Sequence, residues 1–412
     1  MLNWISTRSD AALADAAIAL FRSNFSTEPA GVWAAPGRVN LIGEHVDYAG
    51  GASIPFALEQ NTAVAVAPRE DGQLRIASEF GGKVYRVDVF LEEVGPGWAA
   101  GTPDAWAGYV AGAVWAGLED GVIASCEGLD IAIVSDVPVG SGLSSSAALE
   151  CSVAVAAYEL STGHAPDDAA RTRLVLACMR AENEVVGAST GGLDQNASLF
   201  GQKGKALVLD FSTGEVRRVP FNIAERDMVL LIADTNAPHT LNDGQYASRR
   251  GVIDAVQSAL AGSGARGGTI RDIPDAVAAA TRWAREAGED EGVVKRRVAH
   301  VVEETARTLE AASDLEAGNL DRFWELMRDS HISLRDQYEV TTPELDCAFA
   351  AAGEVGARMT GGGFGGAVIA LVKRADVEST AEAIAAAAAE RGFPAPTFLV
   401  ASPGDGARRI AG

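Results

Sequence analysis

The amino-acid sequence predicts an α+β fold that is divided between two domains. A chain of 412 residues is too long for one ordinary hydrophobic core. Its helix-like and strand-like segments are mixed without a regular β-α-β alternation, which argues against a doubly wound parallel sheet. Apolar residues make up 48% of the chain, enough to build packed cores. We place the boundary near residues 215–227 and expect domains over residues 1–220 and 221–412.

The first half of the chain carries one amphipathic helix, several strands and two further helices. A serine and an aspartate open an apolar pattern that predicts a helix over residues 9–25. Strand-like runs between glycine-rich turns are expected over residues 62–67, 74–78, 84–90 and 129–134. Helices are expected over residues 147–160 and 167–186, and Gly187 is suited to end the second one.

The second half combines strand-like runs with longer helical segments. The strands are expected over residues 205–211, 228–233 and 366–373. The helices are expected over residues 276–287, 293–314, 318–329 and 375–391, the last being rich in alanine. Residues 262–275 are rich in Gly, Arg and Ser and contain a proline, so we expect a loop or short linker there.

Charge and cysteine usage restrict the classes of partner and compartment. With 34 basic and 56 acidic residues the net charge is −22, which disfavours binding to nucleic-acid backbones and to anionic membranes. The four cysteines form no C-x-x-C pair, so we expect reduced thiols and a cytoplasmic location. The five histidines lack the spacing of a zinc site, and no signal peptide or membrane span is visible. We expect no nucleic-acid or membrane partner.

A dense cluster of polar side chains lies within residues 35–51, among glycines and aliphatic residues. The cluster consists of Arg38, Glu44, His45, Asp47 and Tyr48. Carboxylates accept hydrogen bonds from hydroxyls, and Arg and His donate to oxygens, so this group is suited to a polyhydroxylated molecule. The alternative is a surface turn with incidental charges.

A second segment, residues 138–147, has the composition of a phosphate-binding loop. It follows a strand-like run and precedes a helix, so its backbone N–H groups and the positive end of the helix dipole suit a nucleotide phosphate. The candidate ATP-binding residues here are Gly140, Ser141, Gly142, Leu143, Ser144, Ser145 and Ser146. Walker A, Rossmann and protein-kinase signatures are absent. A glycine- and serine-rich helix start without a ligand is the alternative.

Three motifs together resemble a known family of kinases. Residues 37–48 closely resemble the hallmark of galactokinases, and we call them the sugar motif. Residues 139–147 resemble the ATP loop of the GHMP kinases, the wider family that includes galactokinase, homoserine, mevalonate and phosphomevalonate kinases; we keep the name phosphate loop for residues 138–147. Residues 356–366 resemble that family's C-terminal glycine motif, although a flexible linker is the alternative for its glycine run. The motifs occur in the family's order and cover the chain nearly end to end.

The resemblance implies a fold and an activity. The fold would be the two-domain GHMP-kinase fold, with an N-terminal mixed sheet and helices, a C-terminal ferredoxin-like α/β sandwich and the active site between them. The activity would be transfer of the γ-phosphate of ATP to the C1 hydroxyl of galactose, with Mg²⁺ as cofactor. The partners would be galactose and ATP, and the protein would be a monomer.

The resemblance also assigns roles to individual residues. Asp194 would be the catalytic proton acceptor, and Arg38 would stabilise the transition state. Ser146 and Glu182 would hold Mg²⁺, although a solvated helical glutamate beside Glu184 is the alternative for Glu182. The sugar would be bound by Glu44, His45, Asp47 and Tyr246, and Ser78 would contact the nucleotide together with the phosphate loop.

Three departures from the usual pattern leave two alternatives open. Val46 and Ala49 replace the usual Thr and Asn of the sugar motif, and Leu193 stands where Met is common. Because Ala49 removes a polar side chain near the sugar, a kinase for a related sugar such as N-acetylgalactosamine or arabinose is one alternative. A non-catalytic galactose and ATP sensor is the other. Such relatives tend to lose residues around the serine loop, which is intact here at residues 144–148.

Overall fold

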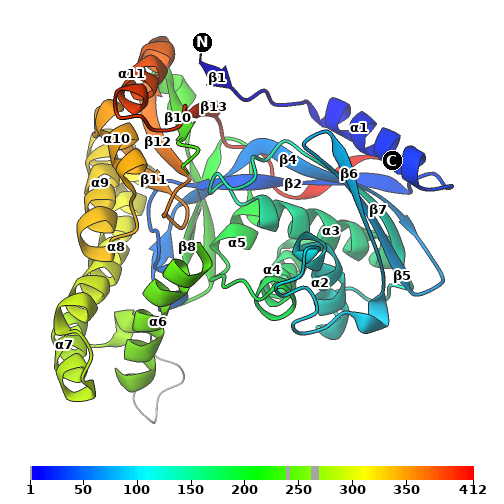
Figure 1. Cartoon of the computed structure of the whole chain (residues 1–412), viewed down its shortest axis with the longest axis horizontal. Coiled ribbons are helices and arrows are strands. Elements are labelled where there is room, and N and C mark those ends of the chain that lie inside the picture. The colour runs from blue at the N-terminus through cyan, green and yellow to red at the C-terminus, as the bar shows by residue number, and fades with distance from the viewer. Residues whose placement is uncertain (1, 238–241, 261–268) are drawn as a thin grey trace.

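The computed structural model describes residues 2–237, 242–260 and 269–412, which form two sheet-centred halves joined side by side (Figure 1). The N-terminal half is built on a six-stranded sheet. Its strands follow the order β14 (Arg408–Ala411), β2 (Gly31–Asn40), β4 (Pro55–Pro68), β7 (Leu129–Ser135), β5 (Gln73–Phe80) and β6 (Lys83–Phe90). All neighbouring pairs are antiparallel except β5 with β7, so the sheet is mixed as expected.

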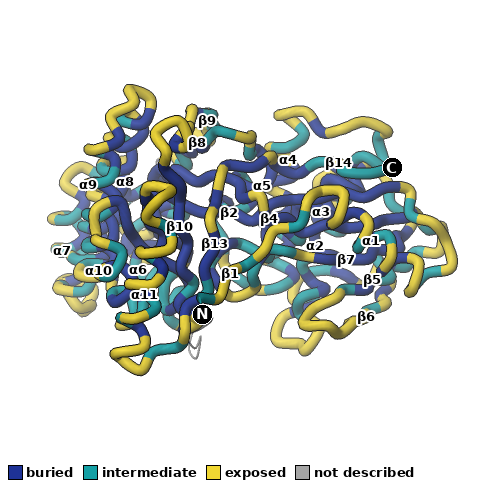
Figure 2. The backbone as a smooth tube through the Cα atoms, turned by 90° about the horizontal axis from the view of Figure 1, so that it is seen from above, coloured by how far each residue is buried: buried dark blue, intermediate teal, exposed yellow. Residues whose placement is uncertain are grey.

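Helices cover both faces of this sheet. One face is covered by α1 (Asp10–Asn24), and the other by α2 (Ala105–Glu119), α3 (Ser145–Thr162), α4 (Asp168–Arg180) and α5 (Leu193–Phe200) (Figure 1). Alternate residues of β2 point to opposite faces of the sheet. Val32 and Ala34 pack against α1, whereas Trp33 and Ala35 pack in the apolar cluster around α3. Both faces are therefore apolar, and β2 is buried along its whole length (Figure 2).

The C-terminal half is a ferredoxin-like sandwich. Its sheet has the order β1 (Asn3–Trp4), β13 (Thr397–Ala401), β10 (Met228–Asp234), β12 (Ala367–Lys373) and β11 (Ala357–Thr360). Without β1 this is the 4-1-3-2 order of the split β-α-β fold, with every neighbouring pair antiparallel. Its helices are α6 (Asn242–Leu260), α7 (Ala276–Ala287), α8 (Glu291–Ala317), α9 (Leu320–Ser333), α10 (Pro343–Ala351) and α11 (Val377–Glu390). The expected α+β GHMP-kinase fold is confirmed.

The first strand of the chain belongs to the C-terminal sheet, and the last strand belongs to the N-terminal sheet. β1 pairs in parallel with β13 in the C-terminal sheet, and β14 pairs with β2 in the N-terminal sheet. A third, small sheet combines β3 (Ala52–Ser53), which lies between β2 and β4 in the chain, with β8 (Lys205–Asp210) and β9 (Glu215–Pro220), which precede β10 in the chain. One apolar cluster contains residues of both halves, among them Phe56 and Ile232. The division at residue 220 stays a prediction, and the structure adds that both chain ends cross it.

Most predicted elements of regular pattern are confirmed, with boundaries that shift by a few residues. The helix predicted over residues 167–186 is α4 continued by a π-helical turn, Ala181–Val186, and Gly187 ends it in the left-handed conformation. In the predicted loop at residues 262–275, residues 262–268 lie outside the described residues, and Ile270–Asp272 form a short 3₁₀ helix. The strand β2 and the helices α2, α5, α6 and α10 were not predicted. α2 is apolar on nearly every side and so shows no clear amphipathic period, and α5 has only eight residues, too few for a period to be recognised from the sequence.

Candidate active site

The three motifs meet where the two sheets approach each other. Arg38 N–H in the sugar motif donates to Leu143 O of the phosphate loop at 3.0 Å. Gly361 N–H of the glycine motif donates to Glu44 Oε1 at 2.7 Å. The phosphate loop and the glycine motif are also in contact, because a Cβ on Gly361 would lie 2.9 Å from Gly142 O. Segments more than 200 residues apart in the chain thus form one site.

A bulge in β2 directs Arg38 into this site. Up to Ala34 the even-numbered residues of β2 face α1, so unbroken alternation would turn Arg38 towards α1 as well. The pairing register shifts between Pro36 and Arg38, which changes the side on which the following residues point. Arg38 consequently lies on the α5 side of the sheet and reaches Asp194. Residues 31–40 are therefore a strand, and only the rest of the polar cluster lies in a turn.

Arg38, Asp194 and Ser144 form a compact group of hydrogen bonds. Arg38 Nε donates to Asp194 Oδ1 at 2.8 Å, and its Nη1 donates to Gly142 O at 2.5 Å. Ser144 Oγ donates to the other carboxylate oxygen, Oδ2, at 2.5 Å. Arg38 is buried, whereas the Asp194 side chain retains 25% exposure. Both oxygens of the predicted proton acceptor are therefore oriented by the protein while the carboxylate stays accessible.

The first serine of the run does not cap the helix that it precedes. Ser144 is the N-cap residue of α3, but it has φ 58° and its side chain makes no capping hydrogen bond. The hydroxyl turns to Asp194 instead. The first N–H groups of α3 consequently keep their capacity to bind an anion, which is the property expected of a phosphate site.

Glu182 lies beside Ser146, as expected for a shared metal ion. The loss of water around the carboxylate and the nearby charge of Asp194 raise the pKa of Glu182 to about 7, against hydrogen bonds from Gln195 and Ser146. Burial also raises the pKa of neighbouring Glu150 well above its ordinary value. Ionising these buried carboxyl groups is thus costly, and a divalent cation beside them would favour their charged forms.

The donor set fits Mg²⁺ when a nucleotide is present. Among the described residues no group of three or more His, Cys, Asp or Glu side chains is arranged to hold a metal ion. Mg²⁺ is commonly held by one or two protein ligands together with substrate phosphates and water. A carboxylate from Glu182 and a hydroxyl from Ser146 match that requirement.

Asp47 lies near Asp194, close enough for the charges of the two carboxylates to interact. Its carboxylate lies so close to Gly191 that a Cβ there would overlap Asp47 Oδ2. The loss of water and the negative charge of Asp194 raise the pKa of Asp47 to about 6, although the N–H of Tyr48 opposes this. A half-buried carboxylate of this kind is suited to accept hydrogen bonds from sugar hydroxyls.

A buried arginine lies next to the Glu44 carboxylate. Arg358 on β11 is fully buried, donates from Nη1 to Asn40 O at 2.9 Å and lies 3.6 Å from Glu44 Oε1. Its Nε and Nη2 atoms have no partner within the described residues. Glu304, also buried, lies close enough for its charge to act on Arg358. Glu44 and Glu304 therefore both compensate the buried guanidinium of Arg358, while Glu304 also pairs with Arg307.

His45 is neutral and joins the sugar motif to the glycine motif. Its Nε2 lies 3.0 Å from Gly362 O, which can only accept, so this nitrogen carries the hydrogen. Its Nδ1 then accepts from Tyr48 OH at 3.1 Å, and Tyr338 OH lies 2.7 Å from Tyr48 OH. Burial, followed by the charge of His300, lowers the pKa of His45 to about 3. Because both ring nitrogens have protein partners, direct sugar binding by His45 stays a prediction.

Tyr246 completes an aromatic wall beside the sugar motif. Its ring centroid lies 5.4 Å from that of His45 and 6.2 Å from that of Tyr48.

Ser78 lies on β5, paired with Tyr85 and with Ile133 near the end of β7, from which the phosphate loop continues. The strand pairing places Ser78 but does not test its role, so a contact of Ser78 with the nucleotide stays a prediction.

Sequence reasoning missed several residues that the fold brings to the site. They are Glu150, Gln195, Tyr338 and Arg358. Gln195 adjoins the predicted base Asp194, and Arg358 lies within the glycine motif, so the signal available for both was their position beside predicted features. Glu150 on α3 and Tyr338 in a π-helical turn lie outside the three motifs, and no motif marked them.

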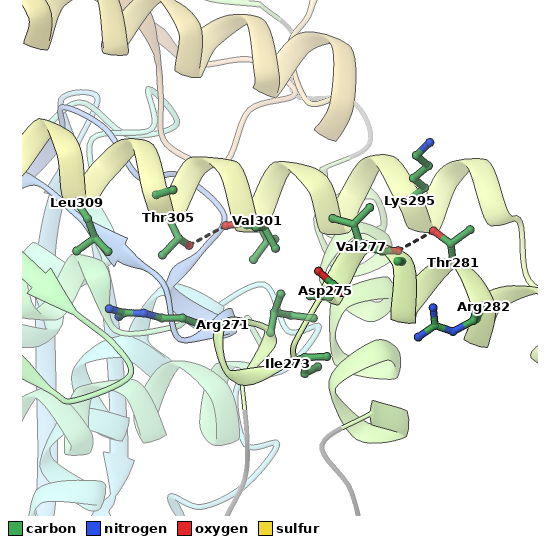
Figure 3. A pocket seen from close by; sticks show the side chains of 15 residues that line it. Arg271, Ile273, Asp275, Val277, Thr281, Arg282, Lys295, Val301, Thr305 and Leu309 are labelled. Atoms are coloured by element: carbon green, nitrogen blue, oxygen red, sulfur yellow. Dashed lines mark hydrogen bonds between the residues drawn. The ribbon is translucent and has the colours of Figure 1, made fainter.

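A separate groove of about 860 Å³ lies away from these motifs, between α7 and α8. Its walls are mainly apolar, with Val277, Val301 and Leu309 among the labelled side chains and Arg282 and Lys295 at one end (Figure 3). None of the predicted site residues lines this groove. The candidate chemistry therefore belongs to the junction of the three motifs.

Comparisons with known proteins agree with this geometry. Residues 19–68 match the galactokinase galactose-binding signature, residues 108–202 the GHMP kinases N-terminal domain and residues 311–391 the GHMP kinases C-terminal domain. Galactokinase from Streptomyces coelicolor is 41% identical over 394 residues, 95% of this chain and 97% of that protein. Human galactokinase is 38% identical over 359 residues, 86% of each chain.

Solved structures support the same assignment. Lactococcus lactis galactokinase complexed with galactose superposes with a TM-score of 0.82 at 31% identity, covering 97% of this chain and 99% of that one. A mevalonate kinase, at 17% identity and a TM-score of 0.58, shares the fold. The sequence motifs, the ferredoxin-like second half and the relatives at 36–41% identity lead to one assignment. The chain belongs to the galactokinase family of GHMP kinases.

Proposed function

We propose that this chain is an ATP-dependent galactokinase that transfers the γ-phosphate of ATP to the C1 hydroxyl of D-galactose, giving α-D-galactose 1-phosphate and ADP. One observation carries the proposal. Asp194 is held by Arg38 and Ser144 between the phosphate loop and the sugar motif, where an acceptor hydroxyl and a phosphoryl group would meet.

The residues of the chain divide the work of phosphoryl transfer. Asp194 accepts the proton of the sugar hydroxyl, and Arg38 neutralises charge on the transferred group and keeps the carboxylate in place. The N–H groups at the start of α3 bind phosphate oxygens. Ser146 and Glu182 would hold Mg²⁺, which when bound neutralises phosphate charge. A loose transition state requires little early deprotonation, so an ionised, arginine-paired aspartate is an adequate base.

The structure supports galactose over a related sugar. Val46 and Ala49, the two departures inside the sugar motif, are buried within the apolar cluster of the C-terminal half. Side chains in that position do not offer polar atoms to a ligand, so their replacement leaves the proposed sugar-binding set of Glu44, His45, Asp47 and Tyr246 unchanged. The intact serine loop and the ordered Asp194 carboxylate support an enzyme over a sensor.

A coupled ADP-release assay on galactose, glucose, N-acetylgalactosamine and arabinose tests this function. We expect steady turnover with galactose and at most slow turnover with the others. Faster turnover with N-acetylgalactosamine or arabinose would reassign the substrate, and ADP release with none of them would favour the sensor.

We further propose a monomeric, cytoplasmic enzyme. All four cysteines lie in the described residues as free thiols, as a reducing compartment would leave them. Within the described residues no helix combines the length and apolar character needed to cross a bilayer. Light scattering on the purified protein and fractionation of cells expressing it would test the two statements.

A further inference from the structure

Gln195 lies between two carboxylates next to the predicted proton acceptor. It is fully buried on α5, and its Nε2 donates to Glu182 Oε2 at 2.7 Å and to Glu150 Oε2 at 3.2 Å. An amide nitrogen carries two hydrogens, so each carboxylate receives one. The amide oxygen faces Thr190 Oγ1, 3.4 Å away. The direction of the amide is therefore determined by its surroundings.

Three chain segments contribute to this arrangement. Ser146 and Glu150 lie one turn apart on α3, so their side chains leave the same face of the helix. Glu182 lies in the π-helical turn that follows α4, and turns of this kind are frequent at functional sites. Glu184, two residues further on, instead pairs with Arg180 at 2.9 Å. Within this turn, the Glu182 side chain therefore points towards Gln195, whereas the Glu184 side chain points towards Arg180.

We infer that Gln195 is a positioning residue that orients the Glu182 carboxylate for the metal-bound nucleotide, and that Glu150 holds the Gln195 amide in the donating direction. The inference rests on the proposed function, in which Glu182 and Ser146 hold Mg²⁺. Donors that orient a metal-binding carboxylate typically change metal affinity about 10–100-fold when removed. Glu150 has one further carboxylate oxygen, Oε1, that is buried and has no partner in the described residues. Within the described residues, no other hydrogen bond of the Glu150 side chain therefore competes with the one from Gln195.

The test measures metal binding directly as well as activity. Mn²⁺ is titrated into the enzyme with a non-hydrolysable ATP analogue and followed by electron paramagnetic resonance, without sugar. We expect Gln195→Met to raise the Mn²⁺ dissociation constant by about 10–100-fold, matched by a rise in the Mg²⁺ concentration for half-maximal rate. Glu150→Gln should act in the same direction with a smaller effect. Glu184→Gln, on the same turn, should leave both values unchanged.

A purely structural role for Gln195 predicts a different result. Misfolding or loosened packing would weaken galactose binding and lower the melting temperature together with metal affinity. We expect the galactose dissociation constant of Gln195→Met, measured by calorimetry without nucleotide, to stay within about twofold of the wild type. The side-chain hydrogen bonds of Gln195 join it to Thr190, Glu150 and Glu182, and none of these residues belongs to the sugar motif. An unchanged Mn²⁺ affinity, or an equal loss of sugar affinity, would overturn the inference.

A double-mutant cycle addresses the coupling itself. If Gln195 acts through Glu182, then Gln195→Met should add little to the loss of Mn²⁺ affinity in a Glu182→Gln background. Additive losses would contradict the inference. Failure of the proposed function is distinguishable, since it would appear as absence of turnover on the sugar panel while the metal titration still depended on Gln195.

Discussion

Arg38 on β2 and Asp194 on α5 form an ion pair with Nε and Oδ1 2.8 Å apart, and this pair connects the central sheet to the helix that carries the predicted base. The pair exists because a β-bulge turns Arg38 away from α1. Ser144 of the phosphate loop donates a hydrogen bond to the other carboxylate oxygen of Asp194. The proposed chemistry thus depends on one strand irregularity, one helix and one loop.

Replacing the predicted base should stop turnover while sparing nucleotide binding. Asn at position 194 keeps the shape of the Asp194 side chain but cannot take up the proton or pair with Arg38 as a charge. We expect Asp194→Asn to lower kcat by at least about 100-fold, the low end of general-base contributions, with ATP affinity nearly unchanged. Steady-state kinetics and calorimetric ATP titration measure these values. Asp168→Asn, which removes a surface partner of Arg218, serves as the control, and wild-type turnover by Asp194→Asn would exclude the role.

Galactose affinity should depend on pH through Asp47. Its pKa is raised to about 6, so below that pH the folded, sugar-free enzyme carries a protonated Asp47, which has lost part of its acceptor capacity. We expect the galactose dissociation constant to rise as the pH falls from 7 to 5 and to level off above 7. Asp47→Asn should bind galactose weakly at every pH, with this dependence removed. A dependence that persists in Asp47→Asn would assign the titration to another group.

The same shift has a defined effect on folding stability. Between pH 3.8 and 6 the folded state keeps a proton on Asp47 that the unfolded state has released. The resulting stabilisation is present below pH 3.8 and is lost as the pH rises through 6. Asp47→Asn should therefore remove a contribution that favours the folded state at low pH, which urea unfolding at pH 5 and pH 7 would detect.

Arg358 should be essential for stability and for sugar binding. Its removal leaves Glu44 as a buried carboxylate without its neighbouring arginine, whereas Glu304 keeps its ion pair with Arg307. Removing one partner of a buried ion pair typically costs roughly 3–5 kcal/mol, so we expect Arg358→Met to lower the free energy of unfolding by that order. Arg358→Lys keeps the charge and should cost less. Urea unfolding measures the loss. For the lysine variant, a raised KM for galactose with little change in KM for ATP would show that Arg358 also positions Glu44.

His300 should make the protein less stable in acid. Burial lowers its pKa from 6.5 to about 4, so between these values only the unfolded state binds a proton. The stabilisation is fully present above pH 6.5 and declines as the pH falls towards 4. Between pH 6.5 and 5 the expected loss is about 2 kcal/mol, at 1.36 kcal/mol per pH unit. His300→Gln, which can still bond to Ser333, should lose correspondingly less, as measured by urea unfolding at the two pH values. An identical pH dependence in both proteins would contradict this.

Local patterns in the sequence were enough to predict the elements with a clear period. The helices α1, α7 and α11, the strands β7 and β10, and the left-handed glycine after the π-helical turn all follow from side chains near in the chain. β2 was missed because it is buried on both faces and contains Pro36 and Gly37, so it shows neither alternation nor uninterrupted strand residues. Its place in the sheet is decided by β4 and by the helices on either side.

The sequence by itself determined which residue types are available for the chemistry: the carboxylates and imidazole of the sugar motif, the amides and hydroxyls of the phosphate loop, and Asp194. Only the tertiary structure decided which of them touch. It directed the Ser144 hydroxyl to Asp194 instead of to its own helix, buried Val46 and Ala49 in the apolar cluster of the C-terminal half, and brought Arg358 and Gln195 to the site. The physical reason is the distance over which each effect acts. Helix and strand patterns arise between residues that are close in the chain, whereas side-chain hydrogen bonds, burial and charge compensation depend on which residues are close in space.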